Sequence, residues 1–464
     1  MRIAIQSTVV VALAIMFSSS AFAGTWEITN QIQGGFIFML EVPDETHAFG
    51  FGSIPDPADP QNDKFTGFKM NPNGTWGEYA PPSSGDMFVP SAIQCTAPDN
   101  CLMLASDITM EPMKMETRLM LSKDGGNKWT TFQKPFWYDS RLPSGFSAFG
   151  KELVIYHSAG TIAYMSHTGG PASDNQSWFV PKVGDTQYLS IQGSFILNDN
   201  VGYVMNQSMT MDSQGNPVSI NPGAALLKTS DLQMPEPRDM AWETLFTDQT
   251  IYARKLHFVN ENVGYMITDD LVNYGLSRTT DGGRNWTPIV FPQVGELAPI
   301  QWVNDIAVFD EDNLFVVAGI PNGEEDSFGV IFRISDGVTP VPVLPDPTEH
   351  QMTMQVIRCV TPYYCLAAGE EATVLRFTDE PPVVVEEDSD IAIVSDGADR
   401  DAFAGDDQGG QIEDVEEGID LKGWTPPKKD SGCSTGNGPG TGPAGLALLI
   451  LGCALCLAWR RRQA

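Results

Sequence analysis

Two near-identical stretches decide the fold: Ser122-Lys123-Asp124-Gly125-Gly126-Asn127-Lys128-Trp129 and Thr279-Thr280-Asp281-Gly282-Gly283-Arg284-Asn285-Trp286. In each stretch the Asp can accept backbone N–H bonds within a tight turn. Gly supplies the positive φ that such a turn needs. The Trp begins the next strand and can bury a large apolar surface. One such stretch is weak evidence for a repeat, but two in register with degenerate copies are strong evidence.

Shorter units surround these stretches. Residues 196–205, 258–267 and 308–317 each read as a strand, a tight polar turn and a second strand. A third strand and a Ser/Thr-Asp turn follow in each unit; the turns contain Asp124, Asp231, Asp281, Asp336 and Asp379, and degenerate copies lie at residues 71–74 and 166–170. Seven units over residues 24–379 give a period of about 51 residues, which is typical of propeller blades.

The Ser/Thr-x-Asp-x-Gly-x-x-Trp pattern resembles the Asp-box, or BNR, repeat of the photosystem stability and assembly factors and of the sialidase superfamily. The resemblance covers residues 24–379 and implies an all-β propeller of four-stranded blades. It gives structural roles to Ser122, Asp124, Gly126, Trp129, Thr279, Asp281, Gly283 and Trp286. We expect seven blades, although six to eight are compatible with the repeat. Residues 25–29 look like the outer strand that the last unit lacks, so we expect the N-terminal strand to complete that blade.

The ends of the chain have the features of export signals. Residues 1–23 combine Arg2, an apolar run and the small-residue site Ala21-Phe22-Ala23, which together predict a secretory signal peptide rather than a buried helix. Residues 380–432 are acidic and poor in aromatic residues, which predicts a disordered stalk. The net charge of −32 argues against nucleic-acid binding, because phosphate neutralisation needs clustered Lys and Arg.

Residues 433–464 carry a short apolar stretch, Ala444 to Trp459, followed at once by Arg460-Arg461-Arg462. With Cys433 upstream, this layout resembles the MYXO-CTERM class of C-terminal sorting signals. The resemblance implies removal of the tail, lipid attachment at Cys433 and display at the cell surface or outer membrane. The alternative is a single transmembrane anchor in the inner membrane, with the body facing the periplasm and the arginines in the cytoplasm.

Four cysteines repeat one spacing within the body. Cys95 and Cys101 are separated by five residues, and so are Cys359 and Cys365, at equivalent places in their units. In an exported protein this arrangement predicts two local disulfides, Cys95–Cys101 and Cys359–Cys365. A four-cysteine zinc site is the alternative, but shorter spacings are expected for it.

The longest insertions fall between the second and third strands of their units, at residues 53–64, 107–116, 206–223 and 320–327. They and nearby turns are rich in carboxylates, and a binding face would contain Asp269, Asp270, Glu324, Glu325, Asp326, Glu370 and Glu371. Such a face suits Ca²⁺ or a basic partner, although a merely solvating acidic surface explains it equally well. Met-x-Met pairs at 113/115, 209/211 and 352/354 leave Cu(I) binding as a further alternative to core packing.

The chain shows no assignable catalytic group. Residues 332–335, Phe-Arg-Ile-Ser, are similar to one arginine segment of sialidases but lack its Pro and lie in the sixth unit. No G-x-S-x-G or H-E-x-x-H motif is present. We therefore expect a binding, recognition or assembly module with a monomeric body, an unidentified protein or glycan partner, and no cofactor unless calcium binds. The alternatives are a divergent sialidase-like glycoside hydrolase and a structural surface-layer component.

Overall fold

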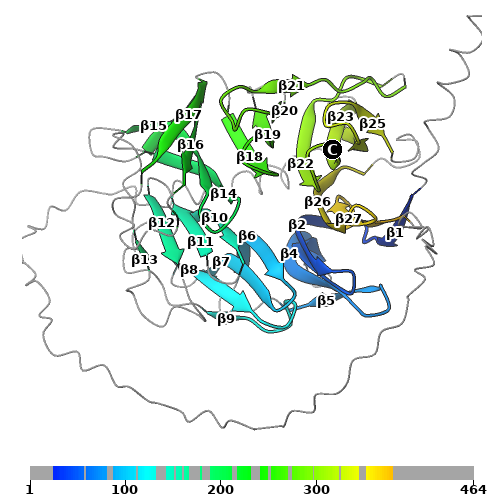
Figure 1. The fold of residues 1–464 in the computed structure, drawn as a ribbon. Coiled ribbons are helices and arrows are strands. Elements are labelled where there is room, and N and C mark those ends of the chain that lie inside the picture. Colours follow the sequence, from blue (N-terminus) through cyan, green and yellow to red (C-terminus); the bar gives the residue numbers. More distant parts are fainter. Residues whose placement is uncertain are drawn as a thin grey trace, which may run out of the picture. The chain divides into compact units, whose positions relative to one another are not determined.

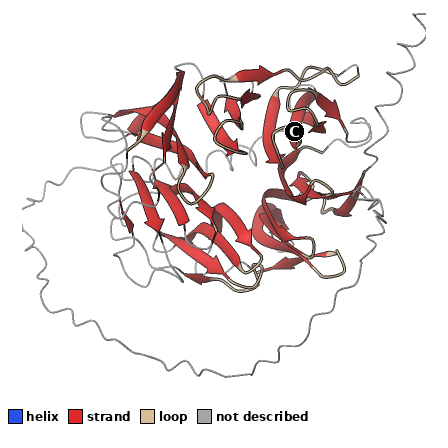
Figure 2. Ribbon diagram, in the orientation of Figure 1, coloured by secondary structure: helices blue, strands red, loops and turns tan. Residues whose placement is uncertain are grey.

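The computed structural model describes the following residues: 24–56, 59–80, 87–110, 113–131, 143–150, 153–158, 161–166, 178–179, 189–211, 217–230, 232, 241–248, 252–269, 274–295, 297–322, 326–343 and 352–379. The predicted signal peptide (residues 1–23), stalk (380–432) and sorting signal (433–464) lie outside them and stay predictions. Strands are the only long regular elements in the described ranges (Figure 2). Within those ranges we find no helix of the length and hydropathy that crossing a membrane requires.

The described strands form seven four-stranded antiparallel sheets, here called blades 1 to 7 in chain order. Blade 1 contains β2 (Phe36–Asp44), β3 (His47–Asp56), β4 (Asp59–Met70) and β5 (Trp76–Tyr79). Blade 2 contains β6 (Met87–Ala97), β7 (Asn100–Met110), β8 (Met113–Ser122) and β9 (Thr130–Thr131). Blade 3 contains β10 (Pro143–Phe149), β11 (Leu153–Ser158), β12 (Thr161–Ser166) and β13 (Trp178–Phe179).

The remaining blades follow the same plan. Blade 4 contains β14 (Leu189–Ile196), β15 (Gly202–Met211), β16 (Pro217–Thr229) and β17 (Glu243–Asp248). Blade 5 contains β18 (Tyr252–Phe258), β19 (Gly264–Asp269), β20 (Tyr274–Thr279) and β21 (Thr287–Ile289). Blade 6 contains β22 (Trp302–Val308), β23 (Leu314–Asn322), β24 (Asp326–Ile334) and β25 (Pro340–Pro342). Blade 7 contains β26 (Met354–Thr361), β27 (Tyr364–Gly369), β28 (Val374–Thr378) and β1 (Thr25–Asn30).

The blades are arranged in a ring (Figure 1). Each blade contacts the next, mostly through its first strand, and blade 7 contacts blade 1 through β26 and β2. Strand order within a blade follows the chain, so the first strand is innermost and the fourth is outermost. This arrangement confirms the prediction of an all-β propeller of four-stranded blades.

The last blade takes its fourth strand from the start of the chain. β1 pairs antiparallel with β28, from Thr25 opposite Thr378 to Asn30 opposite Val374. The Trp26 ring packs edge-on against Phe315 of blade 6, with ring centroids 5.8 Å apart. Residues far apart in the sequence therefore share one sheet and one apolar cluster.

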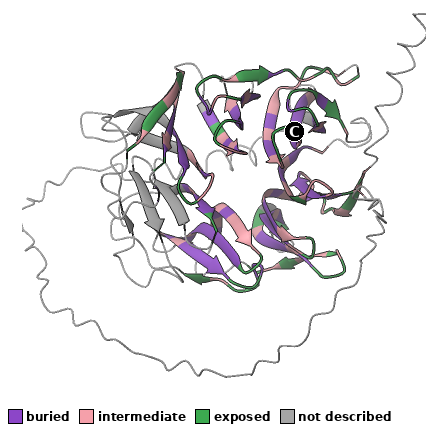
Figure 3. Ribbon diagram, viewed as in Figure 1, coloured by how far each residue is buried: buried purple, intermediate pink, exposed green. Residues whose placement is uncertain are grey.

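The core lies between neighbouring blades. The cluster between blades 5 and 6 combines Tyr265 and Leu276 with Val316 and Phe332, each at most 1% exposed. Further clusters of this kind lie between blades 1 and 2, 4 and 5, 6 and 7, and 7 and 1 (Figure 3). Burying each large apolar side chain contributes about 1.5–3 kcal/mol. Every residue of β27 is buried. A strand that is covered on both faces has no need of polar alternation, which explains its sequence Tyr-Cys-Leu-Ala-Ala-Gly.

The expected insertions are in large part strand rather than loop. β7 and β8 stay paired as far as Met110 opposite Met113, and β23 and β24 as far as Asn322 opposite Asp326. Polar residues such as Thr109 and Lys114 face each other in these ladders. We predicted these segments as insertions between the second and third strands, but the two strands of an antiparallel pair can lengthen together and so take up the extra residues.

Both predicted disulfides are confirmed. Cys95 and Cys101 are bonded and lie directly opposite each other on β6 and β7. Cys359 and Cys365 occupy the same place on β26 and β27 of blade 7. Each bond therefore joins the first and second strands of its blade close to their hairpin turn, and the zinc alternative is wrong.

We expect Trp26→Ala to lower the free energy of unfolding by about 3 kcal/mol, because Trp26 packs against the rings of Phe315 and Phe377. Ile28→Ala on the same strand is the control: Ile28 is 43% exposed, and we expect it to cost less than about 1 kcal/mol. Urea denaturation of both variants measures the difference. Equal effects would contradict a closing role for the Trp26 contacts.

Candidate functional site on the inner strands

The two complete turns have one geometry. Thr279 Oγ1 donates to Asp281 Oδ1 at 2.9 Å and accepts from Gly283 N at 2.9 Å. Asn285 N donates to Asp281 Oδ1 at 2.9 Å, and Trp286 Nε1 donates to Gly283 O at 3.0 Å. The hydrogen bonds inside the turn use the Thr, Asp and Trp polar groups, so these residues build the turn rather than offer a ligand site.

The earlier turn repeats these bonds at equivalent positions. Ser122 Oγ donates to Asp124 Oδ1 and accepts from Gly126 N, both at 2.9 Å. Lys128 N donates to Asp124 Oδ1 at 2.8 Å, and Trp129 Nε1 donates to Gly126 O at 3.1 Å. Glycine is required at position 126: the φ of Gly126 is +84°, and a Cβ there would lie 2.7 Å from the Phe49 ring.

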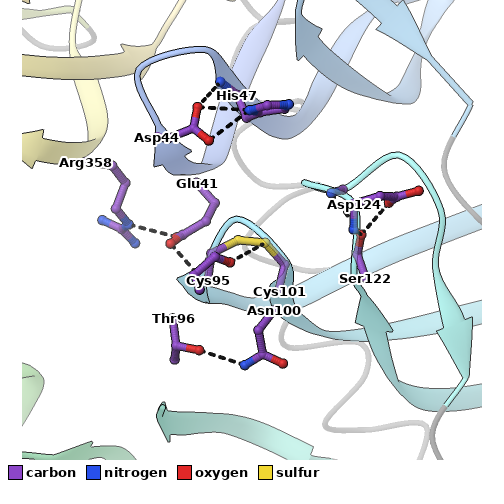
Figure 4. The surroundings of a disulfide bond; sticks show 12 residues. Glu41, Asp44, His47, Cys95, Thr96, Asn100, Cys101, Ser122, Asp124 and Arg358 are labelled. Atoms are coloured by element: carbon purple, nitrogen blue, oxygen red, sulfur yellow. Dashed lines mark hydrogen bonds and ion pairs between the residues drawn. A yellow bond between two sulfur atoms is a disulfide. The ribbon is translucent and has the colours of Figure 1, made fainter. Parts of the chain in front are cut away.

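The turn between the third and fourth strands is hydrogen-bonded to the hairpin between the first and second strands of the same blade. Gly125 N donates to Pro98 O at 2.8 Å, Gly282 N to Asn262 O at 2.8 Å and Gly337 N to Asp312 O at 2.9 Å. Leu232 N and Asp379 N make the equivalent bonds in blades 4 and 7. The hairpins and turns of these blades therefore share one face of the ring, together with the disulfides. Figure 4 shows the Cys95–Cys101 disulfide with Ser122 and Asp124 of the turn in the same blade.

Two of the predicted acidic binding residues accept hydrogen bonds from the backbone of other segments. Glu370 Oε2 accepts from Thr353 N at 3.0 Å, and Glu371 Oε2 accepts from Gly34 N at 2.9 Å. For Asp269 and Asp326 the structure describes only the backbone, at the ends of β19 and β24. The other three predicted residues, Asp270, Glu324 and Glu325, lie outside the described residues. The acidic binding face stays a prediction, without support from Glu370 or Glu371.

Metal binding also stays a prediction. No group of three or more His, Cys, Asp and Glu within the described ranges could hold a metal ion. Of the Met-x-Met pairs, Met354 is 1% exposed in the core, and Met352 Sδ accepts a hydrogen bond from Thr373 Oγ1 at 2.9 Å. This pair packs, as the non-copper interpretation expects. The side chains of the other two pairs are not among those described.

The structure brings together four charged residues that sequence reasoning missed. Glu41 on β2, Lys255 on β18, Asp305 on β22 and Arg358 on β26 form what we call the charged cluster. Arg358 Nη1 donates to Asp305 Oδ2 at 2.6 Å, and Arg358 Nε donates to Glu41 Oε2 at 3.3 Å. Lys255 Nζ pairs with the other oxygen of Asp305. Each residue lies on the innermost strand of its blade, so the cluster crosses from blade 5 through blades 6 and 7 to blade 1.

The cluster is also bonded to the backbone of neighbouring blades. Asp305 Oδ2 accepts from Ile357 N of blade 7 at 3.1 Å, and Lys255 Nζ donates to Ile306 O of blade 6 at 3.2 Å. Glu41 Oε1 accepts from Cys95 N of blade 2 at 3.0 Å (Figure 4). Each bond joins an inner strand to the next one along the chain.

Uncharged side chains continue this pattern. Gln94 of blade 2 bonds both ways with Ala148 of blade 3: Nε2 donates to the carbonyl and Oε1 accepts from the amide, each at 2.9 Å. Ser147 Oγ of blade 3 accepts from Ile196 N of blade 4 at 3.1 Å. The partners are about one repeat apart in the sequence. Polar side chains therefore link the inner strands of blades 2 and 3 and those of blades 3 and 4.

Burial and the neighbouring charges set the protonation of the cluster. Burial alone would raise the pKa of Asp305, but Lys255 and Arg358 outweigh it and hold that pKa below its ordinary value. Burial raises the pKa of Glu41, although Arg358 opposes this. Burial, with Lys255 and Arg358 nearby, lowers the pKa of His257 to about 3, so the ring is neutral at pH 7.

This arrangement does not suit acid–base hydrolysis. Both carboxylates are held by cations and by backbone N–H groups, which leaves neither one placed as a free acid or nucleophile. Sialidase-like chemistry needs three converging arginines, and Arg358 is the only arginine in the cluster that the described residues form. The signal that could have revealed the cluster is a charged residue in the middle of a first strand that is mostly apolar, as Asp305 is in Trp302–Val308.

Comparisons with known proteins give only distant likeness. No family model and no curated protein matches the chain. The chain is similar to solved structures described as YCF48 bound to D1 peptide (14% identity, covering 76% of this chain and 95% of that one, TM-score 0.49) and YCF48 from Cyanidioschyzon merolae (12%, 76% and 98%, 0.47). It is also similar to puromycin hydrolase (11%, 76% and 55%, 0.48). Likeness at this level assigns no family, activity or ligand.

We expect Asp305→Ala to cost about 3–5 kcal/mol of unfolding free energy, because it leaves Lys255 and Arg358 without their shared carboxylate. Glu243→Ala is the matched control, since Glu243 and its partner Arg284 are 59% and 54% exposed, and such pairs contribute at most about 1 kcal/mol. Denaturant unfolding of both variants measures this. Similar costs would show that the cluster does not stabilise the ring.

The turn at Asp281 predicts a pH effect. Hydrogen bonds from Asn285 and neighbouring groups hold the pKa of Asp281 at about 2. A depressed folded-state pKa adds stability above the ordinary Asp pKa of about 4, and this is lost as the pH falls towards 2. Asp281→Asn should therefore destabilise the protein at pH 7, and its difference from wild type should shrink between pH 4 and pH 2. Glu45→Gln, at an exposed turn, changes the charge equally; the same trend there would contradict the assignment.

Proposed function

We propose that this protein is an exported, surface-anchored propeller of seven Asp-box blades, closed by its N-terminal strand, that acts as a binding, recognition or assembly module rather than as an enzyme. The observation that carries the proposal is that the charged side chains of the cluster on the inner strands bond to one another and to the backbone. Glu41, Asp305, Lys255 and Arg358 are engaged with one another and with the backbone of adjacent blades. The acidic and basic side chains on the inner strands, which could otherwise act in catalysis, are thus used in bonds within the ring.

The sequence supports the remaining parts of the proposal. The signal-peptide features of residues 1–23 favour export, as do the two disulfides, because such bonds persist in oxidising compartments. The acidic stalk and the MYXO-CTERM-like tail, with Cys433 as its lipidation site, favour tethering at the cell surface. The partner would be a protein or a glycan that meets the projecting second–third hairpins, and the acidic composition of these segments favours a basic partner or Ca²⁺.

Thermal unfolding of the full chain with and without calcium, beside a glycan and sialoside hydrolysis screen, tests this proposal. A ligand that binds the native state raises the melting temperature by mass action. We expect a calcium-dependent rise without hydrolysis, and magnesium at the same concentration controls for screening of the net negative charge. Hydrolysis would overturn the non-enzymatic proposal. An equal response to both ions would remove calcium from it and leave a protein or glycan partner.

A further inference from the structure

The part of the charged cluster that faces solvent is cationic. The side chains of Lys255 and Arg358 are 32% and 30% exposed, whereas those of Asp305 and Glu41 are only 7% and 10% exposed. The carboxylates therefore lie behind the cations as seen from solvent. This is unusual in a chain whose net charge is −32, because a net negative charge repels anions.

Both cations keep unused hydrogen-bond donors. An ammonium group has three N–H donors and a guanidinium has five. Within the described structure, Lys255 Nζ donates to Asp305 and to Ile306 O, which leaves one donor. Arg358 donates through Nε to Glu41 and through Nη1 to Asp305 and Ile357 O. Its Nη2 amino group, with two donors, has no partner among the described residues.

The two cationic groups are also held in place beside each other. They contact different oxygens of one carboxylate, that of Asp305. This carboxylate is itself fixed by Ile306 N at 3.0 Å and Ile357 N at 3.1 Å. A ligand that accepts from both cations therefore finds them already ordered, which lowers the entropic cost of binding.

We propose that Lys255 and Arg358 form a binding site for a small oxyanion, a carboxylate or phosphate group, on the inner strands of blades 5 and 7. The planar guanidinium presents its free Nη2 donors to an oxygen of the anion, and the ammonium donates to another. The buried carboxylates of Asp305 and Glu41 orient the two cations and keep the site from carrying a large positive charge. This inference goes beyond the proposed function and does not rest on export, anchoring or calcium.

The ring of His257 can report on this site. His257 follows Lys255 by two residues on β18, and both Lys255 and Arg358 act electrostatically on its ring. The chain has five histidines, so ring resonances in a proton–carbon correlation spectrum can be assigned with His257→Gln. The full chain is titrated with sodium phosphate and, separately, with sodium acetate, at ionic strength held constant with sodium chloride. We expect a saturable shift of the His257 resonances in at least one titration.

Variants locate the binding. Lys255→Met should weaken the titrated anion about tenfold, as expected for loss of one charge-assisted hydrogen bond. Lys64→Met is the matched control: Lys64 is 51% exposed and pairs with Glu78 on blade 1, so the affinity should not change. Saturation by acetate alone assigns a carboxylate ligand, and saturation by phosphate alone assigns a phosphate.

Two outcomes would overturn the site. One is a His257 ring that shows no saturable shift with either anion in the folded wild-type protein. The other is a shift that drifts equally at all five histidines, which would mean general ion effects only. Both outcomes come from the wild-type chain, so the test holds even if Lys255→Met fails to fold. Neither bears on the calcium and hydrolysis experiments.

Discussion

The carboxylate of Asp305 carries the interaction on which the ring depends. It accepts from Lys255 of blade 5, from the backbone of its own blade 6, and from Ile357 N and Arg358 of blade 7. Arg358 continues to Glu41 of blade 1, which accepts from the first strand of blade 2. One connected set of bonds therefore spans five blades and includes the junction between the end and the start of the chain. Removing Arg358 leaves the buried carboxylates of Asp305 and Glu41 without this partner, which is costly.

A second set of bonds acts at the same junction between blades 7 and 1, at the turn between β27 and β28. Glu371 and Ala372 have φ values of +56° and +42°, a conformation that costs non-glycine residues of order 1 kcal/mol or more each. Segments from the N-terminal side hold this turn: Asn30 Nδ2 donates to Ala372 O at 2.7 Å, and Ile32 N donates to Glu371 O at 2.6 Å. Strain of this kind persists only where its surroundings fix it. The last residue of β1 and the segment that follows it thus fix a turn whose conformation would be unfavourable alone.

The sequence predicted the fold well and the charged cluster not at all, for one physical reason. A turn such as Thr279 to Trp286 is local, so its residue spacing encodes its hydrogen bonds directly, and the five-residue spacing within each cysteine pair does the same for a hairpin. Lys255, Asp305 and Arg358 instead meet because equivalent positions on successive blades become neighbours, about one repeat apart. Predicting these contacts requires the exact strand register and the position of the bulge in each first strand, such as the one between Val303 and Asp305. Residue spacing within a single repeat specifies neither the register nor the bulge.

The same architecture separates stability from recognition. On one face, disulfides join the first and second strands, and the third–fourth turns are bonded to the hairpins beside them. A change on that face therefore disturbs the bonds that hold the strands of a blade together. On the other, the second and third strands of blades such as 2 and 6 stay paired along long ladders, β7–β8 and β23–β24. Their tips can vary without breaking a contact between blades, because loops on a rigid scaffold tolerate change. Selection for a new partner would therefore act on the hairpin tips, while the charged cluster keeps the inner strands fixed.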